Sequence, residues 1–212
     1  RDGILNGDDP FTVMSPVAFQ SPNEAYWAHV DFLVNKALEL EMLLIVNPCY
    51  FGFQGGGQGW YNEMNAASDA NLFAFGVFLG TRYWQPNIDW AWGGDYDGDA
   101  TSRAKQRQIL AGIRSVRTTN YNTFHAAPGN NSSDVVALAD YPNFFDWCYA
   151  YENSGVYPFA KVAAAYGATP ARVVMFGEGH YENESSTLQQ LRRQSYSSFL
   201  SGARAQSYGN SP

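Results

Sequence analysis

Apolar positions in this chain alternate between helical spacing and short continuous runs. In segment 21–40 the apolar side chains recur three or four positions apart, at Tyr26, Val30, Leu33, Val34, Ala37 and Leu38. Segment 42–46 is apolar throughout and is followed by Asn47 and Pro48. A short apolar run of this kind is typical of a buried parallel strand. The pattern therefore predicts a helix followed by a strand.

The same alternation continues to the end of the chain. We expect further helices over 71–83, 101–116, 158–166 and 186–200, and strands over 88–92, 120–125, 144–151, 172–176 and 203–208. Alternating β and α units predict a parallel sheet with helices packed outside it. The expected fold class is α/β.

The first predicted helix carries a start signal. Ser21 has the side chain of an N-cap, Pro22 suits the first helical position, and Glu24 completes a capping box. We therefore expect the helix to begin directly after Ser21.

Two carboxylates follow Gly residues close to the ends of predicted strands. Asp95 follows the run Ile-Asp-Trp-Ala-Trp-Gly-Gly, and Glu178 follows Val-Val-Met-Phe-Gly. Gly allows a sharp turn where a strand ends. A pair of acids at such positions can divide the acid, base and nucleophile roles around a glycosidic bond. The alternative is structural: Asp95 would start a turn or cap, and Glu178 would pair with an Arg.

Two sheet arrangements fit the pattern, an open doubly wound sheet and a (β/α)8 TIM barrel. Positions 95 and 178 are 83 residues apart with two predicted strands between them, which makes three units of about 28 residues. A barrel has eight strands in about 250 residues. Six are predicted here, after an initial helix. We therefore expect one catalytic domain over 1–212, a barrel incomplete at its N-terminus that contains about strands three to eight, with both acids at strand C-terminal ends.

Composition narrows the range of ligands. The chain has 212 residues, is 45% hydrophobic and 16% charged, and carries a net charge of −7. The negative charge argues against nucleic acid and anionic membranes as partners. Aromatic residues make up 16% of the chain, including 6 Trp and 14 Tyr. Their rings can stack on sugars or fill a core. The two cysteines, Cys49 and Cys148, lie in or near predicted strands and are expected to be buried free thiols.

Other polar clusters in the sequence have a functional and a structural interpretation. Asp95-Tyr-Asp97-Gly-Asp99 resembles the start of a calcium loop but lacks the later Gly and Glu, which leaves a looser cation site or a helix cap. His125 ends a predicted strand and can bind a substrate hydroxyl, tune a carboxylate or be structural. We expect no metal, no other cofactor, and no Ser-His-Asp triad, since no Gly-x-Ser-x-Gly elbow occurs.

Several blocks together resemble a known family. They are Arg82-Tyr83, Asn87 to Asp95, Phe176-Gly-Glu178-Gly-His-Tyr181-Glu182, Arg192-Arg193, and the stretch from Ser201 to Gly209. This order resembles the apiosidase-like glycoside hydrolases, bacterial (β/α)8 barrels often described as putative collagenases. Gly179 stands where that family often has Pro. The resemblance implies that Asp95 and Glu178 are the catalytic acids, and that a strand-helix-strand segment precedes the part seen here.

These observations predict a glycosidase that cleaves a plant-type or other complex polysaccharide or oligosaccharide with retention, in a secreted or periplasmic location. Asp95 is expected as general acid/base and Glu178 as nucleophile. The expected substrate-binding residues are Tyr50, Trp60, Trp92, His125, Tyr181 and Glu182. A missing N-terminal segment or a second chain would complete the barrel. Two alternatives stay open: a carbohydrate-binding barrel without catalysis, and a metal-assisted hydrolase or lyase.

Overall fold

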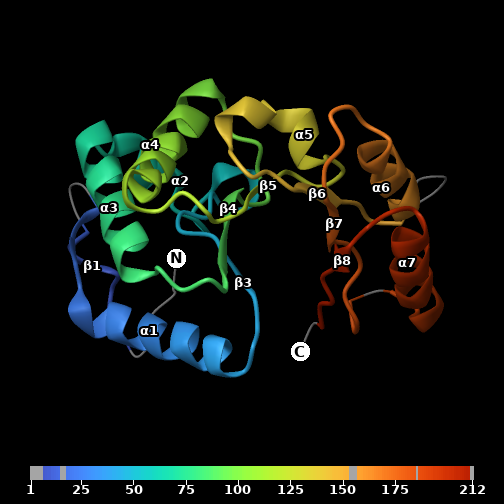
Figure 1. Ribbon diagram of the computed structural model, residues 1–212, viewed down its shortest axis with the longest axis horizontal. Coiled ribbons are helices and arrows are strands. Elements are labelled where there is room, and N and C mark those ends of the chain that lie inside the picture. The colour runs from blue at the N-terminus through green and yellow to red at the C-terminus, as the bar shows by residue number, and fades with distance from the viewer. Residues whose placement is uncertain (1–6, 15–17, 153–156, 185, 211–212) are drawn as a thin grey trace. The chain divides into compact units, whose positions relative to one another are not determined.

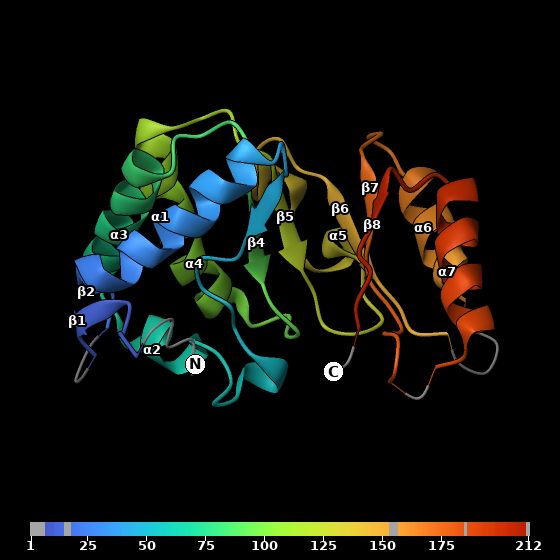
Figure 2. The same cartoon turned by 90° about the horizontal axis from the view of Figure 1, so that it is seen from below.

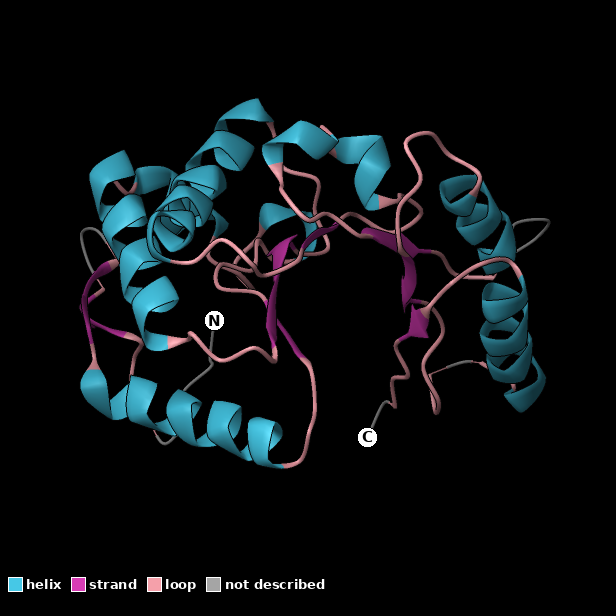
Figure 3. Cartoon of the chain, in the orientation of Figure 1, coloured by secondary structure: helices cyan, strands magenta, loops and turns pink. Residues whose placement is uncertain are grey.

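The computed structural model describes residues 7–14, 18–152, 157–184 and 186–210. Helices alternate with short strands along the chain, as the secondary-structure colouring shows (Figure 3). The chain forms two compact units, which are described separately. Unit 1 comprises residues 1–93 and 98–120, and unit 2 comprises residues 94–97 and 121–212.

Unit 1 contains a small hairpin, one pair of parallel strands and most of the long helices (Figure 1). Strands β3 and β4 pair in parallel, with Leu44 opposite Ile88 and Val46 opposite Trp90. Strands β1 and β2 pair antiparallel. The elements of unit 1 are β1 (Phe11–Val13), β2 (Gln20–Pro22), α1 (Glu24–Glu39), β3 (Leu44–Val46), η1 (Phe53–Gly55), α2 (Tyr61–Ala66), α3 (Asp69–Arg82), β4 (Ile88–Gly93) and α4 (Ala100–Val116).

Helix α1 begins two residues later than the capping box predicts. Its N-cap is Asn23, whose side chain accepts a hydrogen bond from the Ala25 N–H, while Ser21 and Pro22 belong to strand β2. Pairing with β1 determines this outcome: Pro22 lies opposite Phe11, and the Asn23 N–H donates to the carbonyl of Pro10. The tertiary contact with the hairpin therefore overrides the local Ser-Pro signal.

Helices α3 and α4 cross at unusually short range because Gly residues form the crossing. A Cβ built on Gly76 would lie 2.0 Å from the Ile109 carbonyl oxygen, and one on Gly112 would lie 2.1 Å from that of Phe73. Only hydrogen fits at these two positions. The crossing therefore depends on the small residue on each helix.

Unit 2 is built on a three-stranded parallel sheet in the order β6-β7-β8. Asp146 lies opposite Val174, and Met175 lies opposite Ala205. Strand β5 joins the sheet region through a parallel bridge between Asn122 and Phe144. The elements of unit 2 are β5 (Asn122–His125), α5 (Ser132–Val135), η2 (Leu138–Asp140), β6 (Asp146–Tyr149), α6 (Pro158–Tyr166), β7 (Val174–Glu178), α7 (Leu188–Leu200) and β8 (Ala205–Gln206).

Helices α6 and α7 lie side by side on one face of this sheet, as both ribbon views show (Figures 1 and 2). Apolar residues of the sheet and of α6 form a buried cluster between the layers: Cys148, Ala150, Val162, Ala165, Val174, Phe176 and Ala203. Burying a side chain such as Phe176 contributes about 1.5–3 kcal/mol. Since odd and even strand residues face opposite ways, this cluster directs Trp147, Met175 and Gly177 to the other face.

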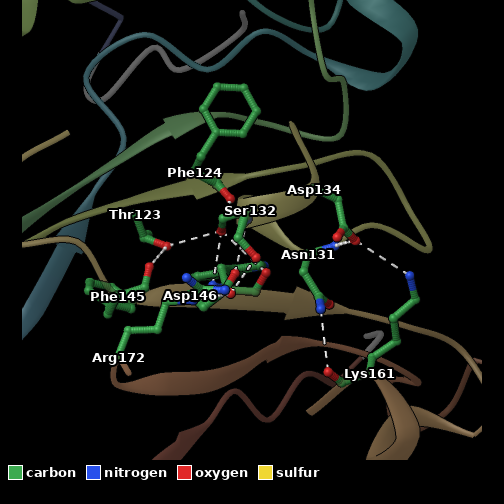
Figure 4. A network of polar contacts seen from close by, with 11 residues as sticks. Thr123, Phe124, Asn131, Ser132, Asp134, Phe145, Asp146, Lys161 and Arg172 are labelled. Carbon is green, nitrogen blue, oxygen red and sulfur yellow. Dashed lines mark hydrogen bonds and ion pairs between the residues drawn. The ribbon is translucent and has the colours of Figure 1, made fainter. Parts of the chain in front are cut away.

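The loop before α5 and the first turn of this helix, with Ser132 and Ser133, are inserted between β5 and β6 (Figure 4). The hydroxyl of Ser132, which is fully buried, donates to the Phe124 carbonyl at 2.5 Å and accepts from the Trp147 N–H at 2.9 Å. Asp146 anchors the same loop by accepting from the Ser133 N–H and hydroxyl, and it forms an ion pair with Arg172. A side-chain hydroxyl thus replaces ladder hydrogen bonds and holds the two strand ends apart.

The predicted alternation of helices and strands is confirmed; most strands are shorter than expected, whereas β4 and β7 are not. The sequence analysis did not predict β1, β2, α2 and α5, which are short elements determined by tertiary contacts. No closed sheet occurs among the described residues, so the α/β fold with parallel strands is established and the closed barrel is not. Cys49 and Cys148 are buried and free, as predicted. None of the described helices is both long and apolar enough to span a membrane.

Candidate active site

The turn that carries Asp95 consists of residues in the left-handed region of backbone space. Gly93, Gly94 and Asp95 have φ values of 72°, 124° and 51°. Gly adopts these values freely, whereas a residue with a Cβ is strained there, and Asp is among the residues that tolerate the region best. The Gly94 N–H donates to the carbonyl of His125 at 2.7 Å. The Gly-Gly pair therefore turns the chain directly after β4 so that Asp95 follows two residues beyond the strand.

Asp95, His125 and Glu178 meet in unit 2, although they are distant in sequence. Nε2 of His125 lies 2.8 Å from Oε2 of Glu178 and 3.4 Å from Oδ1 of Asp95. One polar atom from each of the three residues lies within 4.8 Å of the others. The side chains are 21%, 14% and 10% exposed for Asp95, His125 and Glu178. The structure thus brings the two predicted acids within hydrogen-bonding reach of one imidazole.

The charge of His125 follows from this arrangement. Burial by itself lowers the pKa of His125, but the hydrogen bonds and negative charges of Asp95 and Glu178 outweigh burial and raise the pKa from 6.5 to about 9. His125 is consequently an imidazolium at neutral pH. A cation between two partly buried carboxylates offsets their mutual repulsion.

Glu178 has a second donor in Tyr181, three residues further along the chain. The Tyr181 hydroxyl donates a short hydrogen bond to Oε1 of Glu178. Burial raises the pKa of Tyr181, and the bond to Glu178 raises the pKa further, so the phenol keeps its proton and remains a donor. Each oxygen of Glu178 is therefore matched with a different donor group.

Two more tyrosines extend the site from the end of β6. The hydroxyls of Tyr149 and Tyr151 lie 3.2 Å apart, and the Tyr149 ring lies 5.6 Å from the ring of His125. Burial raises the pKa of Tyr149, followed by its hydrogen bond with Tyr151 and the charges of Glu178 and Asp95. The sequence analysis did not select these residues as ligands. The sequence pattern that could have identified them is the alternation of Trp147, Tyr149 and Tyr151 in the predicted strand 144–151, since alternate residues of a strand share one face.

Gly177 acts by leaving space and not by turning the chain. A Cβ at Gly177 would lie 2.1 Å from ring atoms of Trp147, so the indole covers the backbone of the residue before Glu178. The Trp147 ring in turn lies 5.0 Å from the ring of His125. Gly is thus required before the second acid, because the Trp147 ring that packs against His125 occupies the space where a side chain would lie.

His180 contacts the loop after β6 and helix α7. Its Nε2 contacts the carbonyl of Glu152 at 2.9 Å, and Gln194 binds both its N–H and its carbonyl. Arg193, on helix α7, forms an ion pair with Glu152. The contacts to the Glu178 carboxylate therefore come from His125 and Tyr181, while His180 contacts the loop that follows β6.

The other predicted substrate ligands have different surroundings. Glu182 accepts a short hydrogen bond from Tyr208, and its N–H donates to the Gly209 carbonyl, so it ties the β7 loop to the C-terminal segment. Tyr50 and Trp60 line an apolar cavity of about 180 Å³ inside unit 1. Trp92 is fully buried at the end of β4, and its part in substrate binding stays a prediction.

The Asp95-Tyr-Asp97-Gly-Asp99 segment does not have the contacts of a calcium loop. Asp97 accepts hydrogen bonds from the Ala127 N–H and from Nδ2 of Asn130. Asp99 is the N-cap of α4, as predicted, and accepts from the Ser102 N–H. The set with metal-ligand geometry is instead Asp95, His125 and Glu178, two carboxylates and one imidazole.

A family of catalytic domains matches almost the whole chain. The family described as "Apiosidase-like, catalytic domain" matches residues 3–212. No curated protein matches the chain.

Two solved structures share the fold. One is a glycoside hydrolase family 5 protein from Bacteroides vulgatus ATCC 8482, with 24% identity, a TM-score of 0.70, and an alignment that covers 87% of this chain and 43% of that one. Another, described as a glycoside hydrolase, has 22% identity and a TM-score of 0.66 and aligns over 87% of this chain and 45% of its own. The chain spans less than half the length of either.

Proposed function

Since this chain belongs to the apiosidase-like family of catalytic domains, we propose that it is a glycoside hydrolase in which Asp95 and Glu178 cleave a glycosidic bond. The observation that carries the proposal is the meeting of both carboxylates at one imidazole, with polar atoms at most 4.8 Å apart. Retaining glycosidases hold their two carboxyl groups about 5–5.5 Å apart, and inverting enzymes about 6.5–9.5 Å. The shorter distance supports a retaining mechanism.

In this mechanism Glu178 is the nucleophile. Its two oxygens lie against His125 and Tyr181, which orient the carboxylate for attack on the anomeric carbon. Asp95 protonates the leaving oxygen and then, as a base, activates the water that hydrolyses the glycosyl-enzyme. The imidazolium of His125, 3.4 Å from Asp95, can supply the proton that the acid needs before the first step.

The rings of Trp147, Tyr149 and Tyr151 support a carbohydrate as the substrate. Aromatic faces stack on the C–H groups of sugars, and phenol hydroxyls hydrogen-bond to sugar hydroxyls. We propose a plant-type or other complex oligosaccharide, taken up by a domain that forms part of a (β/α)8 barrel. The fold likeness to longer glycoside hydrolases supports the barrel.

A second candidate function is metal-assisted hydrolysis or lysis. The donor set of Asp95, His125 and Glu178 favours it, because two carboxylates and one imidazole are suitable ligands for a divalent cation. Binding would require His125 to release its proton, so metal affinity would increase with pH. The two candidates therefore differ in their response to a chelator.

The test is hydrolysis of a panel of aryl glycosides and plant cell-wall oligosaccharides. We expect turnover that is unaffected by EDTA, and we expect Glu178→Gln to abolish it. Asp95→Asn should lose natural substrates but retain aryl glycosides with good leaving groups, which need little protonation. NMR of the first product anomer should show retention. Inversion would sink the nucleophile role of Glu178.

The alternatives have distinct results. Loss of activity in EDTA, restored by Mn²⁺ or Zn²⁺, would replace the glycosidase proposal with the metal-assisted one. Saturable binding of an oligosaccharide without any turnover, unchanged in Glu178→Gln, would indicate a carbohydrate-binding domain.

A further inference from the structure

The loop that carries Asp95 cannot keep its conformation by local preference alone. Asp95 and Gly98 both have positive φ values, 51° and 63°, and Gly94 has a φ of 124°. A non-Gly residue in the left-handed region persists only where surrounding contacts fix it. The position of the Asp95 carboxyl must therefore depend on contacts made by its neighbours in the loop.

Asp97 makes the side-chain contacts that meet this need. Its Oδ1 accepts from the Ala127 N–H at 2.7 Å, and its Oδ2 accepts from Nδ2 of Asn130 at 2.8 Å. Both donors lie in the loop directly after β5, the strand that ends at His125. Hydrogen bonds to an ionised carboxylate are shorter and about twice as strong as those between neutral groups. Asp97 thus joins the Asp95 loop to the His125 loop with two strong bonds.

The same contacts reach a third part of the site. The Asn130 carbonyl accepts from the Tyr149 N–H at 3.3 Å, and the Gly129 N–H donates to the Tyr149 carbonyl at 3.0 Å. The loop held by Asp97 is therefore paired with the end of β6. One carboxylate connects the segments that carry Asp95, His125 and Tyr149.

We propose that Asp97 is a positioning residue of the candidate active site: it sets the distance between the Asp95 carboxyl and the His125 imidazole. The proposal rests on the glycosidase function only for its kinetic consequence, since the geometric claim can be measured without a substrate. Displacement of a catalytic group by 1 Å can reduce a rate about 100-fold.

The chain offers a matched control at Asp99. This residue lies in the same acidic segment but caps α4 by accepting from the Ser102 N–H. Asp99→Ala should lower the melting temperature by an amount similar to Asp97→Ala, because each variant loses a hydrogen bond to a backbone N–H group. A difference between the two variants therefore reports position and not general stability.

The kinetic experiment compares kcat and KM for an aryl glycoside in the full chain. For Asp97→Ala we expect kcat to fall about 10–100-fold with KM changed less than about threefold, because the loss concerns the transition state. Asp99→Ala should stay within about twofold of the unchanged protein. Asp97→Asn should stay within about fivefold, since its amide oxygen still accepts from Ala127 and the Asn130 amide can rotate.

The second measurement is the pKa of His125 by NMR titration of its imidazole. The chain has only three histidines, and the His125 signal is the one missing in His125→Gln. Asp95, Glu178 and the Tyr149 phenol are the titratable groups that act on or pack against it. If Asp97 holds Asp95 near His125, its removal should lower this pKa by about one unit. The Asp99→Ala variant should show no change.

The pKa measurement decides the proposal. A His125 pKa in Asp97→Ala within about 0.3 units of that in Asp99→Ala would overturn it. Equal kcat values for Asp97→Ala and Asp99→Ala, on a substrate that the protein hydrolyses, would also overturn the proposal. If no glycoside is hydrolysed, the proposed function fails, while a lowered pKa still supports the positioning role. Should Asp97→Ala not fold, Asn130→Ala removes one of the two bonds, and the same criteria apply to it.

Discussion

Nε2 of His125 lies 2.8 Å from Oε2 of Glu178, so the predicted nucleophile has a cationic partner from a different strand. Strands β5 and β7 each end at one of these two residues, at His125 and at Glu178. The pair therefore depends on where the two strand ends lie in unit 2. This relationship, together with the contact to Asp95, makes the charge state of the site sensitive to pH.

Stability should fall as the pH rises from neutral to alkaline. The pKa of His125 is raised from 6.5 to about 9 by Asp95 and Glu178, against the effect of burial, so the folded state binds the proton more tightly. The resulting stabilisation is complete below pH 6.5 and is lost as the pH rises through about 9. We expect a loss of about 1–3 kcal/mol from this group, measured by urea unfolding at several pH values.

His125→Gln is the control for that experiment. It lacks the titrating imidazole but retains a donor of similar size. Its stability should change less between neutral and alkaline pH than that of the unchanged protein. Identical pH dependence of the two proteins would show that His125 is not the group responsible.

Tyr181→Phe should impair catalysis more than binding. The variant removes the hydrogen bond to Oε1 of Glu178 and leaves the ring in place. Losing a hydrogen bond to a charged group costs about 1.5–3 kcal/mol, so we expect kcat to fall about 10–100-fold. Steady-state kinetics on an aryl glycoside measures this. Tyr208→Phe, which loses the bond to Glu182 instead, should remain close to full activity; equal losses in both variants would contradict a specific role for Tyr181.

Gly177→Ala should destabilise unit 2. The added Cβ would lie 2.1 Å from the Trp147 ring, and the indole cannot stay against His125 unless the backbone moves. Overpacking of this kind typically costs about 1–3 kcal/mol. Thermal unfolding measures the loss, with Gly57→Ala as the control because nothing lies within 4 Å of a Cβ built there. The double variant Gly177→Ala/Trp147→Ala should lose less stability than the sum of the losses in the two single variants, because the clash is absent without the indole. Additive losses would contradict this prediction.

Ser132→Ala should loosen the junction between β5 and β6. The variant leaves the Trp147 N–H without this acceptor and removes one donor from the buried Phe124 carbonyl. An unsatisfied buried polar group costs about 1–3 kcal/mol. Chemical denaturation should show this loss, and hydrogen exchange should be faster at the Trp147 amide. Ser197→Ala, at an exposed hydroxyl on α7, should change neither measurement.

The sequence alone determined the order of the longer helices and of the parallel strands, and it singled out Asp95 and Glu178 as candidate acids. Apolar periodicity is a local property, and segments such as 158–166 and 101–116 form helices close to the predicted bounds because burial follows that periodicity. The Gly-Gly-Asp95 and Gly-Glu178 blocks are also local patterns, since each consists of an acid directly after Gly near the end of an apolar run. The family resemblance rested on these blocks and on their order.

Only the tertiary structure decided which polar groups surround those acids. Glu178 is matched with His125 from another strand and with Tyr181 from its own loop, and Asp97 bonds to a loop some 30 positions away. Periodicity and spacing do not encode such partners, because strand ends that are distant in sequence are brought together by pairing and packing. Tertiary contacts also decide the N-cap of α1, which is Asn23 and not the predicted Ser21. Strand pairing in the hairpin outweighs a local capping preference worth about 1 kcal/mol.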